Sequence, residues 1–348
     1  MNLQELLHKD ELTRDEIIYL LNLTDKEDLQ FLYARADEVR AQYCGDEVHL
    51  RGIIEISNFC EQNCVYCGLR QDNNSLPRYR MTPEEVIETA RIITNLGIFT
   101  IVLQSGEDTN FDSDIISYII YQIRQQSNAA ITLSLGERTF DEYRAWKIAG
   151  ADRYLLKHET ANSVLYEAYH LKQKLSERLE HLRFLKSIGY QIGSGNLIGL
   201  PMQTVEDLAD DILLCKELDL DMAAFGPFIP SPNTPYQHKP TGEAELTLKV
   251  TAVARLVLKQ VHIPATTALD TIDPIGRERG LKAGANIVMP DLTPFPYREQ
   301  YQIYPGKRGS QDDPLESTAR LQKRIEALGR KISYKRGDSL KLDLQQPL

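Results

Sequence analysis

Three of the five cysteines in the chain, Cys60, Cys64 and Cys67, lie within eight residues of one another. Three thiolates on one short loop can bind three irons of a 4Fe–4S cluster and leave the fourth iron open, whereas electron-transfer clusters ordinarily use four cysteines. The alternatives are a zinc site and incidental core cysteines. Zinc ordinarily takes four ligands from paired motifs, and the sequence has no matching second pair. The spacing therefore predicts a reactive iron–sulfur centre.

The cysteines follow the first of eight predicted strands, most of them near-continuous apolar runs typical of parallel strands that are covered on both faces. The predicted strands are residues 47–57, 98–104, 130–135, 152–157, 190–198, 221–228, 261–267 and 285–289. Helices between them begin with capping-box patterns, such as Thr82 with Glu85 and Thr204 with Asp207. Strands alternating with helices predict an α/β fold.

We expect this fold to be a (β/α)8 TIM barrel over residues 46–306, with its active site at the carboxyl ends of the strands. A doubly wound open sheet is the alternative. Residues 1–45 are expected to form a helical extension, and residues 307–348 a helical tail packed on the barrel, with a helix at 314–328. Cys44 and Cys215 are interpreted as packing residues.

Composition excludes several other classes of protein. The 348 residues carry 40 basic and 50 acidic side chains, a net charge of −10 that argues against general nucleic-acid binding. No apolar run approaches the roughly 18–20 residues of a membrane span. The first residues lack the pattern of a signal peptide. We therefore expect a cytoplasmic protein with reduced thiols and no nucleic-acid or membrane partner.

The CX3CX2C spacing, with Tyr66 directly before the last cysteine, resembles that of the radical S-adenosylmethionine (SAM) enzymes. The resemblance implies that the open iron takes the amino and carboxylate groups of SAM, which is cleaved reductively to methionine and a 5′-deoxyadenosyl radical. It also implies a SAM pocket at the strand ends, where Glu159 contacts ribose or the amino group and Arg178 pairs with the carboxylate. Taken alone, Glu159 and Arg178 would be interpreted as a surface ion pair. The residues assigned to this cofactor pocket by resemblance are Tyr66, Gln104, Ser105, Gly106, Glu107, Ser134, Glu159, Arg178 and Gly199.

Further segments resemble the HydE family of FeFe-hydrogenase maturases, and less so the related biotin synthases and methylornithine synthases. These segments are residues 63–70, 79–85, 103–108, 158–162, 226–230 and 264–268. The resemblance implies assembly of the dinuclear iron subcluster of the hydrogenase H-cluster from an iron–cysteine complex that carries carbon monoxide and cyanide. It also implies a reductant such as ferredoxin or flavodoxin, with other hydrogenase maturases as partners.

The same resemblance assigns a catalytic position near the radical carbon to Tyr304, although a lone tyrosine could equally be core. It assigns an anion-holding cavity in the barrel to Thr132, Arg153, Thr266, Thr267 and Met289. The threonines could equally be ordinary filling of the barrel. Arg153, as an inward cation, requires either a bound anion or an acidic neighbour.

Three departures from the family pattern stand out. Many members hold an accessory cluster with further cysteines near the C-terminus, but residues 307–324 contain none. Lys157 stands where arginine is frequent, and Asp291 where an amide is frequent. Another thiol-containing small molecule therefore stays open as the substrate. The competing functions are a methylornithine synthase-like mutase or sulfur-transfer enzyme on a small amino acid, and a non-catalytic carrier of an iron–sulfur synthon.

Overall fold

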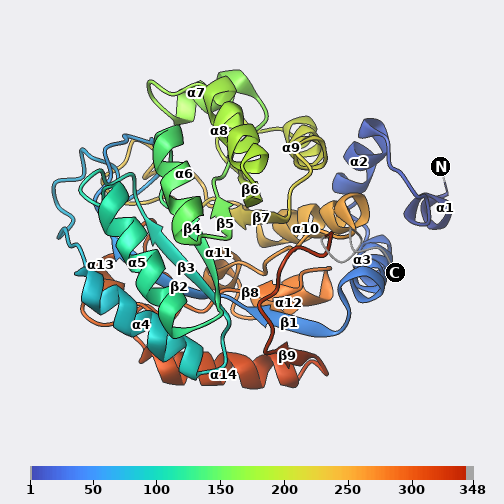
Figure 1. Ribbon diagram of the computed structural model, residues 1–348. Coiled ribbons are helices and arrows are strands. Elements are labelled where there is room, and N and C mark those ends of the chain that lie inside the picture. The colour runs from blue at the N-terminus through green and yellow to red at the C-terminus, as the bar shows by residue number, and fades with distance from the viewer. Residues whose placement is uncertain (1, 342–348) are drawn as a thin grey trace.

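The computed structural model describes residues 2–341, in which helices surround a ring of parallel strands (Figure 1). Six strands pair in chain order and in parallel. They are β2 (Gly52–Ser57), β3 (Thr100–Ser105), β4 (Ala130–Ser134), β5 (Arg153–Leu155), β6 (Gln191–Ile198) and β7 (Met222–Pro227). Their nearly complete burial explains why the sequence shows apolar runs instead of alternation.

Two further strand positions, at residues 262–264 and 287–288, close this sheet into a barrel. β1 (Glu47–Leu50) precedes β2 with only Arg51 between them, and it pairs in parallel with β8 (Ile287–Val288). Single bridges join Met222 to His262, Pro264 to Ile287 and Ile53 to Asp291. Hydrogen bonds therefore continue from β7 through residues 262–264 and β8 back to β1 and β2. The predicted (β/α)8 barrel is confirmed.

The seventh predicted strand, residues 261–267, is wrong in extent. It is reduced to the bridges at His262 and Pro264, and proline has no N–H to donate to a ladder. The Thr266 side chain accepts a hydrogen bond from the Leu269 N–H and so begins helix α11 (Thr267–Ile272). Thr266 and Thr267 therefore lie at a helix start and not on a strand.

The helices around the barrel begin where the sequence predicts. Capping boxes at Thr82 and Thr204 start α4 (Pro83–Asn95) and α9 (Val205–Glu217). The other helices of the ring and its loops are α5 (Ser113–Gln126), α6 (Phe140–Ala149), α7 (Ser163–Tyr169), α8 (Leu175–Ser187), α10 (Ala244–Leu258), α12 (Gly276–Lys282) and α13 (Tyr297–Gln300). Before the barrel lie the expected α1 (Leu3–Leu7), α2 (Arg14–Leu21) and α3 (Lys26–Cys44). Of these, α3 packs on α10 and α2 on α9.

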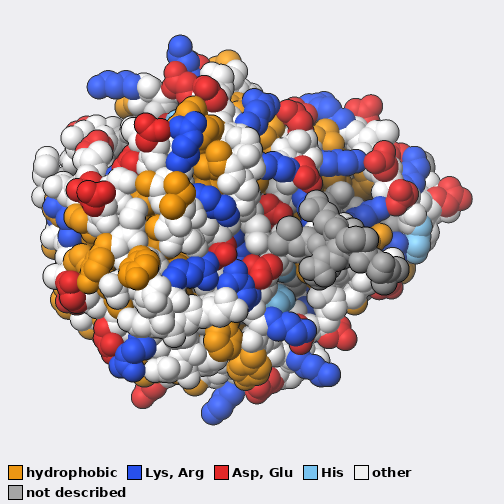
Figure 2. All heavy atoms as spheres, viewed as in Figure 1, with side chains coloured by type: hydrophobic (Ala, Val, Ile, Leu, Met, Phe, Trp, Pro, Cys, Tyr) orange, Lys and Arg blue, Asp and Glu red, His pale blue; other side chains and the backbone are white. Residues whose placement is uncertain are grey.

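The segment after the barrel is not purely helical. It contains α14 (Pro314–Glu326), close to the predicted helix, and then the unpredicted strand β9 (Lys331–Ser333), which pairs in parallel with β1. Only three residues long and half exposed, β9 carries no apolar run that the sequence could reveal. On the face shown in Figure 2, acidic and basic side chains are interspersed with apolar ones.

Residues 336–339 cover the amino-terminal ends of the barrel strands. The Asp338 carboxylate accepts a hydrogen bond from Arg153 at 2.8 Å, and the Asp338 carbonyl lies 2.9 Å from His262 Nε2. The Arg336 carbonyl accepts from Arg153 at 2.9 Å, and the Ser339 N–H donates to Gln191 at 2.9 Å. This segment therefore supplies the acidic neighbour that a buried Arg153 requires.

Replacing Asp338 with asparagine should lower the free energy of unfolding by about 1–2 kcal/mol, because the buried Arg153 loses its carboxylate partner while Asp338 itself is partly exposed. Urea unfolding measures the change. The matched control is Asp141→Asn, which removes an exposed carboxylate from Arg144 and should cost less than about 0.5 kcal/mol. Equal effects of the two substitutions would show that this segment does not stabilise the barrel.

Candidate functional site

The cysteine loop leaves the carboxyl end of β2 and is tied to three other segments of the barrel. The Glu61 N–H donates to the Glu107 carbonyl at 2.9 Å, and the Val65 N–H donates to the Tyr169 carbonyl at 3.0 Å. The Gly68 N–H donates to the Ile303 carbonyl at 2.9 Å. The loop is thus anchored on both sides of its cysteines, and the structure brings Cys60, Cys64 and Cys67 together at the predicted end of the barrel.

Arg78 organises this loop from within. Its guanidinium donates to the backbone carbonyls of Asn58, Leu69, Arg70 and Asn73 at 2.5, 2.9, 2.7 and 3.2 Å. One planar side chain therefore holds four points of the loop that carries the cysteines. Sequence reasoning missed Arg78, because nothing in its neighbourhood distinguishes it from the exposed Arg80.

Arg78→Lys should lower the free energy of unfolding by about 2 kcal/mol, because an ammonium group cannot reach all four carbonyls. The iron content after reconstitution should fall with it. Urea unfolding and iron analysis measure the two effects. Arg91→Lys, at an exposed position of α4 with Glu88 as its partner, is the control and should change neither. A full iron content in the Arg78 variant would contradict the clamping role.

The three cysteines are half-buried residues, and the sulfurs of Cys60 and Cys64 contact hydrogen-bonding groups. The Gln62 and Glu107 N–H groups both donate to Cys60 Sγ at 3.4 Å. Cys64 Sγ lies 3.3 Å from His170 Nδ1. Burial raises the pKa of all three thiols, that of Cys67 to about 12. Without a metal the thiols stay protonated, so metal binding would release protons.

The donor set fits an iron–sulfur cluster. N–H groups directed at a cysteine sulfur are a common feature around cluster thiolates, whose potential they adjust. Within residues 2–341, no three His, Cys, Asp or Glu side chains are arranged to hold a single metal ion. Three cysteines that bind three different irons need not converge on one point.

The turn after β3 packs directly against this loop. A Cβ placed on Gly106 would lie 2.3 Å from the Phe59 carbonyl oxygen and 2.6 Å from Cys60 Cβ, so only glycine fits. Ser105 Oγ donates to the Gly106 carbonyl at 2.6 Å, and Gln104 Nε2 donates to Tyr301 Oη at 3.2 Å. The predicted segment of residues 104–107 therefore lies beside the cysteines.

Glu159 occupies a strained position at the end of the β5 segment. Its φ of +62° is left-handed, a conformation that costs a non-glycine residue about 1 kcal/mol or more and is concentrated at functional sites. The Glu159 N–H donates to the Gly195 carbonyl at 3.0 Å, which holds the residue there. Glu159 Oε2 is buried without a hydrogen-bond partner, and Lys157 Nζ is 3.7 Å away. A buried carboxylate oxygen in this state has capacity for a ligand.

Arg178, on α8, is buried near the same strand ends. Its Nε donates to Glu137 at 2.5 Å and its Nη1 to the Lys157 carbonyl at 2.9 Å. The guanidinium also lies 5.8 Å from the centre of the Tyr166 ring. Sequence reasoning assigned Arg178 to a ligand carboxylate and missed Glu137, which belongs to no motif.

The remaining predicted cofactor residues also lie at the carboxyl side of the barrel. Ser134 ends β4 and is paired in register with Gln104. Gly199 follows β6 with a φ of +84°, and a Cβ there would lie 2.6 Å from Gly242 Cα. Tyr66 is in edge contact with the His170 ring, and its hydroxyl lies 3.2 Å from His170 Nε2.

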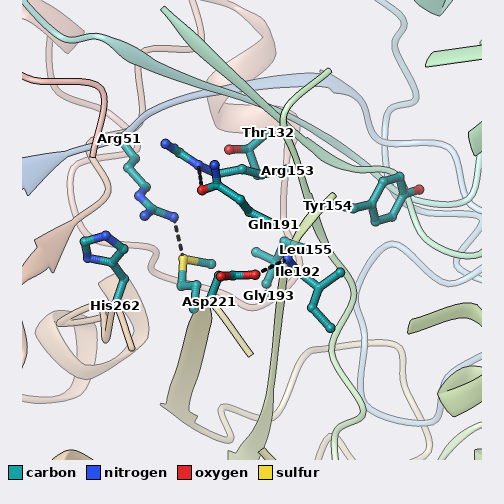
Figure 3. Close-up of a pocket in the computed structure, with 11 residues that line it drawn as sticks. Arg51, Thr132, Arg153, Tyr154, Leu155, Gln191, Ile192, Gly193, Asp221 and His262 are labelled. Atoms are coloured by element: carbon teal, nitrogen blue, oxygen red, sulfur yellow. Dashed lines mark hydrogen bonds between the residues drawn. The ribbon is translucent and has the colours of Figure 1, made fainter. Parts of the chain in front are cut away.

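The predicted anion cavity divides into two places. Thr132 and Arg153 are neighbours in register near the amino-terminal end of the barrel, where they line a cavity of about 10 Å³ with Arg51, Met222 and other residues (Figure 3). Thr266, Thr267 and Met289 do not line it. The first two lie at the start of α11, and Met289 follows β8 at the other end of the barrel.

Arg51 was missed by sequence reasoning, because a single arginine between two apolar runs has no motif. It is fully buried, its Nη1 lies 2.8 Å from Met222 Sδ, and its Nη2 donates to the Gly337 carbonyl at 3.4 Å. Arg51 Nε and the neighbouring Thr132 Oγ1 have no hydrogen-bond partner. This end of the barrel therefore has unused donors, although Asp221 also lines the cavity and Asp338 pairs with Arg153.

A second buried ionic cluster lies nearer the carboxyl ends of the barrel strands. Lys307 Nζ contacts both oxygens of Glu55, at 2.6 and 2.7 Å, and Asp291 Oδ2 at 2.8 Å. Burial and the neighbouring Asp291 raise the pKa of Glu55 to about 8. The sequence analysis singled out Asp291 as a departure from the family pattern but missed its pairing with Lys307. Tyr304 precedes Lys307 by three residues, and burial raises its pKa to about 12.

Comparison with known proteins adds a family relationship to this geometry. Residues 54–215 match the radical SAM superfamily. The chain is 50% identical over 327 residues to the [FeFe] hydrogenase maturase subunit HydE of Thermotoga maritima, covering 94% of each. It is 29% identical to the 3-methylornithine synthase of Methanosarcina acetivorans, covering 94% of this chain and 92% of that protein.

Solved structures agree with the fold. The crystal structure of methylornithine synthase (PylB) superposes with a TM-score of 0.84 at 27% identity, covering 96% of this chain and 97% of the other.

Within residues 2–341, no helix is both long and apolar enough to cross a membrane.

Proposed function

Since this chain belongs to the HydE family of radical SAM proteins, we propose that it takes part in building the dinuclear iron subcluster of the FeFe-hydrogenase H-cluster. The observation that carries the proposal is the 50% identity along nearly the whole length of the Thermotoga protein. Identity to the methylornithine synthase is much lower over a similar length, which favours the maturase over the amino-acid mutase.

In this proposal Cys60, Cys64 and Cys67 bind the cluster. With both bound, the cluster would supply the electron for reductive cleavage of SAM to methionine and a 5′-deoxyadenosyl radical. Arg78 holds the loop that presents the three thiolates, and the N–H groups of Gln62 and Glu107 stabilise charge on Cys60 Sγ.

The SAM pocket is proposed at the strand ends next to the loop. The unpartnered oxygen of Glu159 offers an acceptor for ribose hydroxyls or the amino group. Arg178 offers a cation for the carboxylate, which would then compete with or join Glu137. The other residues proposed for the pocket are assigned to it because they lie at this end of the barrel. They are Tyr66, Gln104, Ser105, Gly106, Glu107, Ser134 and Gly199.

The substrate is proposed to be an anionic iron–cysteine complex with carbon monoxide and cyanide ligands, or another thiol-containing small molecule. At the amino-terminal end of the barrel Arg51 Nε and Thr132 Oγ1 lack partners, but the cavity of about 10 Å³ there has room for about one water-sized group and not for the complex. Arg153 is already paired with the carboxylate of Asp338. Its proposed contribution is the positive charge that holds the segment around Asp338 against this end of the barrel. At the other end of the barrel, Thr266, Thr267 and Met289 are proposed to contact the complex and Tyr304 to lie by the reacting atoms.

The proposed setting is the cytoplasm, with ferredoxin or flavodoxin as reductant and other hydrogenase maturases as partners. The experiment is hydrogenase maturation in a system that lacks HydE, with this protein added in the presence or absence of SAM. Restored hydrogenase activity that requires SAM and is accompanied by 5′-deoxyadenosine supports the maturase. Restoration without SAM consumption identifies a carrier, and no restoration contradicts the proposal.

A further inference from the structure

A cavity of about 270 Å³ beside the barrel mouth is lined by five arginines from different parts of the chain. They are Arg277 of α12, Arg298 of α13, Arg308 of the loop before α14, and Arg320 and Arg324 of α14. We call this cavity the arginine pocket. Seven of its sixteen lining residues come from the segment 307–324, which contains no cysteine.

The acidic side chains in the arginine pocket already have partners. Asp270 is fully buried, with Arg324 at 2.9 Å and Arg277 at 3.4 Å. Glu278 pairs with Arg324 at 2.5 Å, and Asp312 with Arg320 at 2.5 Å.

The fourth carboxylate is only partly available to the arginines. Asp291 is held by Lys307 at 2.8 Å and lies 3.7 Å from Arg298 Nε. Five guanidinium groups therefore face four carboxylates, one of them engaged by Lys307, in a chain whose net charge is −10. Among the lining residues the excess is one positive charge, and Arg320 has a further acidic partner outside the lining, Glu316 at 3.7 Å.

Two of the buried guanidinium groups have unused donors. Arg298 is 2% exposed, and its Nε and Nη1 have no hydrogen-bond partner. Arg277 is 9% exposed, and although its Nη2 donates to Thr267 Oγ1 at 3.0 Å, its Nε has no partner. A buried charged donor without an acceptor has lost its hydration and gained no hydrogen bond in return, which destabilises the folded protein. An anion in the pocket would remove this cost.

We propose that the arginine pocket binds a small, multiply charged oxyanion, recognised through its oxygens by the forks of Arg277 and Arg298. Planar guanidinium groups match phosphate and carboxylate oxygens and hold them with charge-assisted hydrogen bonds. The cavity volume suits a free phosphate or a small polycarboxylate. None of the cysteines lines the pocket, so the site is separate from the cluster, but it shares Thr267 with the residues proposed to contact the substrate complex.

Ser317 offers a direct way to fill the site without removing a buried arginine. A Cβ built on Gly309 would lie 3.2 Å from Ser317 Oγ and 3.3 Å from Arg298 Nη2, so the serine and this arginine flank the same point. Ser317→Glu places a carboxylate where the ligand is expected. Ser317→Gln has nearly the same size without the charge and is the matched control.

The test is titration of the full-length protein with inorganic phosphate and, separately, with citrate, by isothermal calorimetry. We expect saturable binding of at least one anion, loss of affinity by about tenfold or more in Ser317→Glu, and a change of less than about threefold in Ser317→Gln. Binding of phosphate alone, or of citrate alone, identifies which oxyanion the pocket takes.

A second variant keeps the proposal testable if Ser317→Glu fails to fold. Arg320 is about half exposed at the rim of the pocket, and Arg320→Glu should weaken the same anion, whereas Arg144→Glu on distant α6 should not. No saturable binding of either anion below about 10 mM overturns the proposal. Undiminished binding in Ser317→Glu and Arg320→Glu also overturns it, because the anion would then bind elsewhere.

Discussion

Replacing Cys64 with serine is expected to abolish both the iron–sulfur EPR signal of the reconstituted protein and the formation of 5′-deoxyadenosine from SAM. A hydroxyl is a much poorer ligand for cluster iron than a thiolate, and only two cysteines would remain on the loop. The loss should exceed about 100-fold, since even residues that merely support a metal ligand are worth 10–100-fold. EPR spectroscopy and product analysis under anaerobic conditions measure the two effects.

Cys215→Ser is the matched control. Cys215 is fully buried on α9, in the apolar core, as the sequence analysis interpreted it. The serine variant should keep the EPR signal and the product, with a loss of stability of about 1 kcal/mol from burying a hydroxyl. If the two variants keep equal signals, the loop with Cys64 does not hold the cluster.

Replacing Lys307 with methionine is expected to lower the free energy of unfolding at pH 7 by about 3–5 kcal/mol. The substitution removes the cation between Glu55 and Asp291 while both carboxylates stay buried. Arg298 remains 3.7 Å from Asp291, but Glu55 keeps no cationic partner. Urea unfolding measures the change, and Lys335→Met, at an exposed lysine of the same chain, should change it by less than about 0.5 kcal/mol.

The raised pKa of Glu55 sets the direction in which the free energy of unfolding changes with pH. Burial raises the pKa of Glu55 from its ordinary 4.5 to about 8 in the folded protein, so folding favours the protonated carboxyl. Its contribution to stability is therefore complete below about pH 4.5 and is lost as the pH rises towards 8. Without Lys307 the pKa rises further, and the stability of the variant should fall more steeply between pH 6 and 9 than that of the wild type.

A double substitution separates charge from packing. Glu55→Gln in the Lys307→Met background removes the buried carboxyl that must take up a proton on folding, so most of the lost stability should return and the extra pH dependence should disappear. A loss below about 1 kcal/mol in the single variant, or no recovery in the double variant, would contradict a paired buried cluster.

Features of the fold with a local signal could be predicted from the sequence. Apolar runs placed the strands, and capping boxes at Thr82 and Thr204 placed helix starts. The seventh strand failed because Thr266 can be a strand residue or a helix cap, and only the Leu269 N–H in the folded chain decides between them. Strand β9 depends on a free edge of β1, which no pattern near residue 331 shows.

The candidate site divides in the same way. The cysteine triad is a local pattern, and the structure places all three cysteines on one anchored loop. Arg153 was correctly said to need an anion or an acid, but its acid, Asp338, is 185 residues away. Lys307 and Glu55 are 252 residues apart, so their pairing is likewise set by the closed barrel and not by spacing.

The most direct test of the central claim, that this chain holds an open-iron cluster that reacts with SAM, is EPR spectroscopy of the reduced, reconstituted protein before and after SAM is added. The account predicts a 4Fe–4S signal that changes shape when SAM binds, followed by 5′-deoxyadenosine in the product mixture. A protein without a 4Fe–4S signal, or a signal that SAM leaves unchanged with no 5′-deoxyadenosine formed, would contradict it.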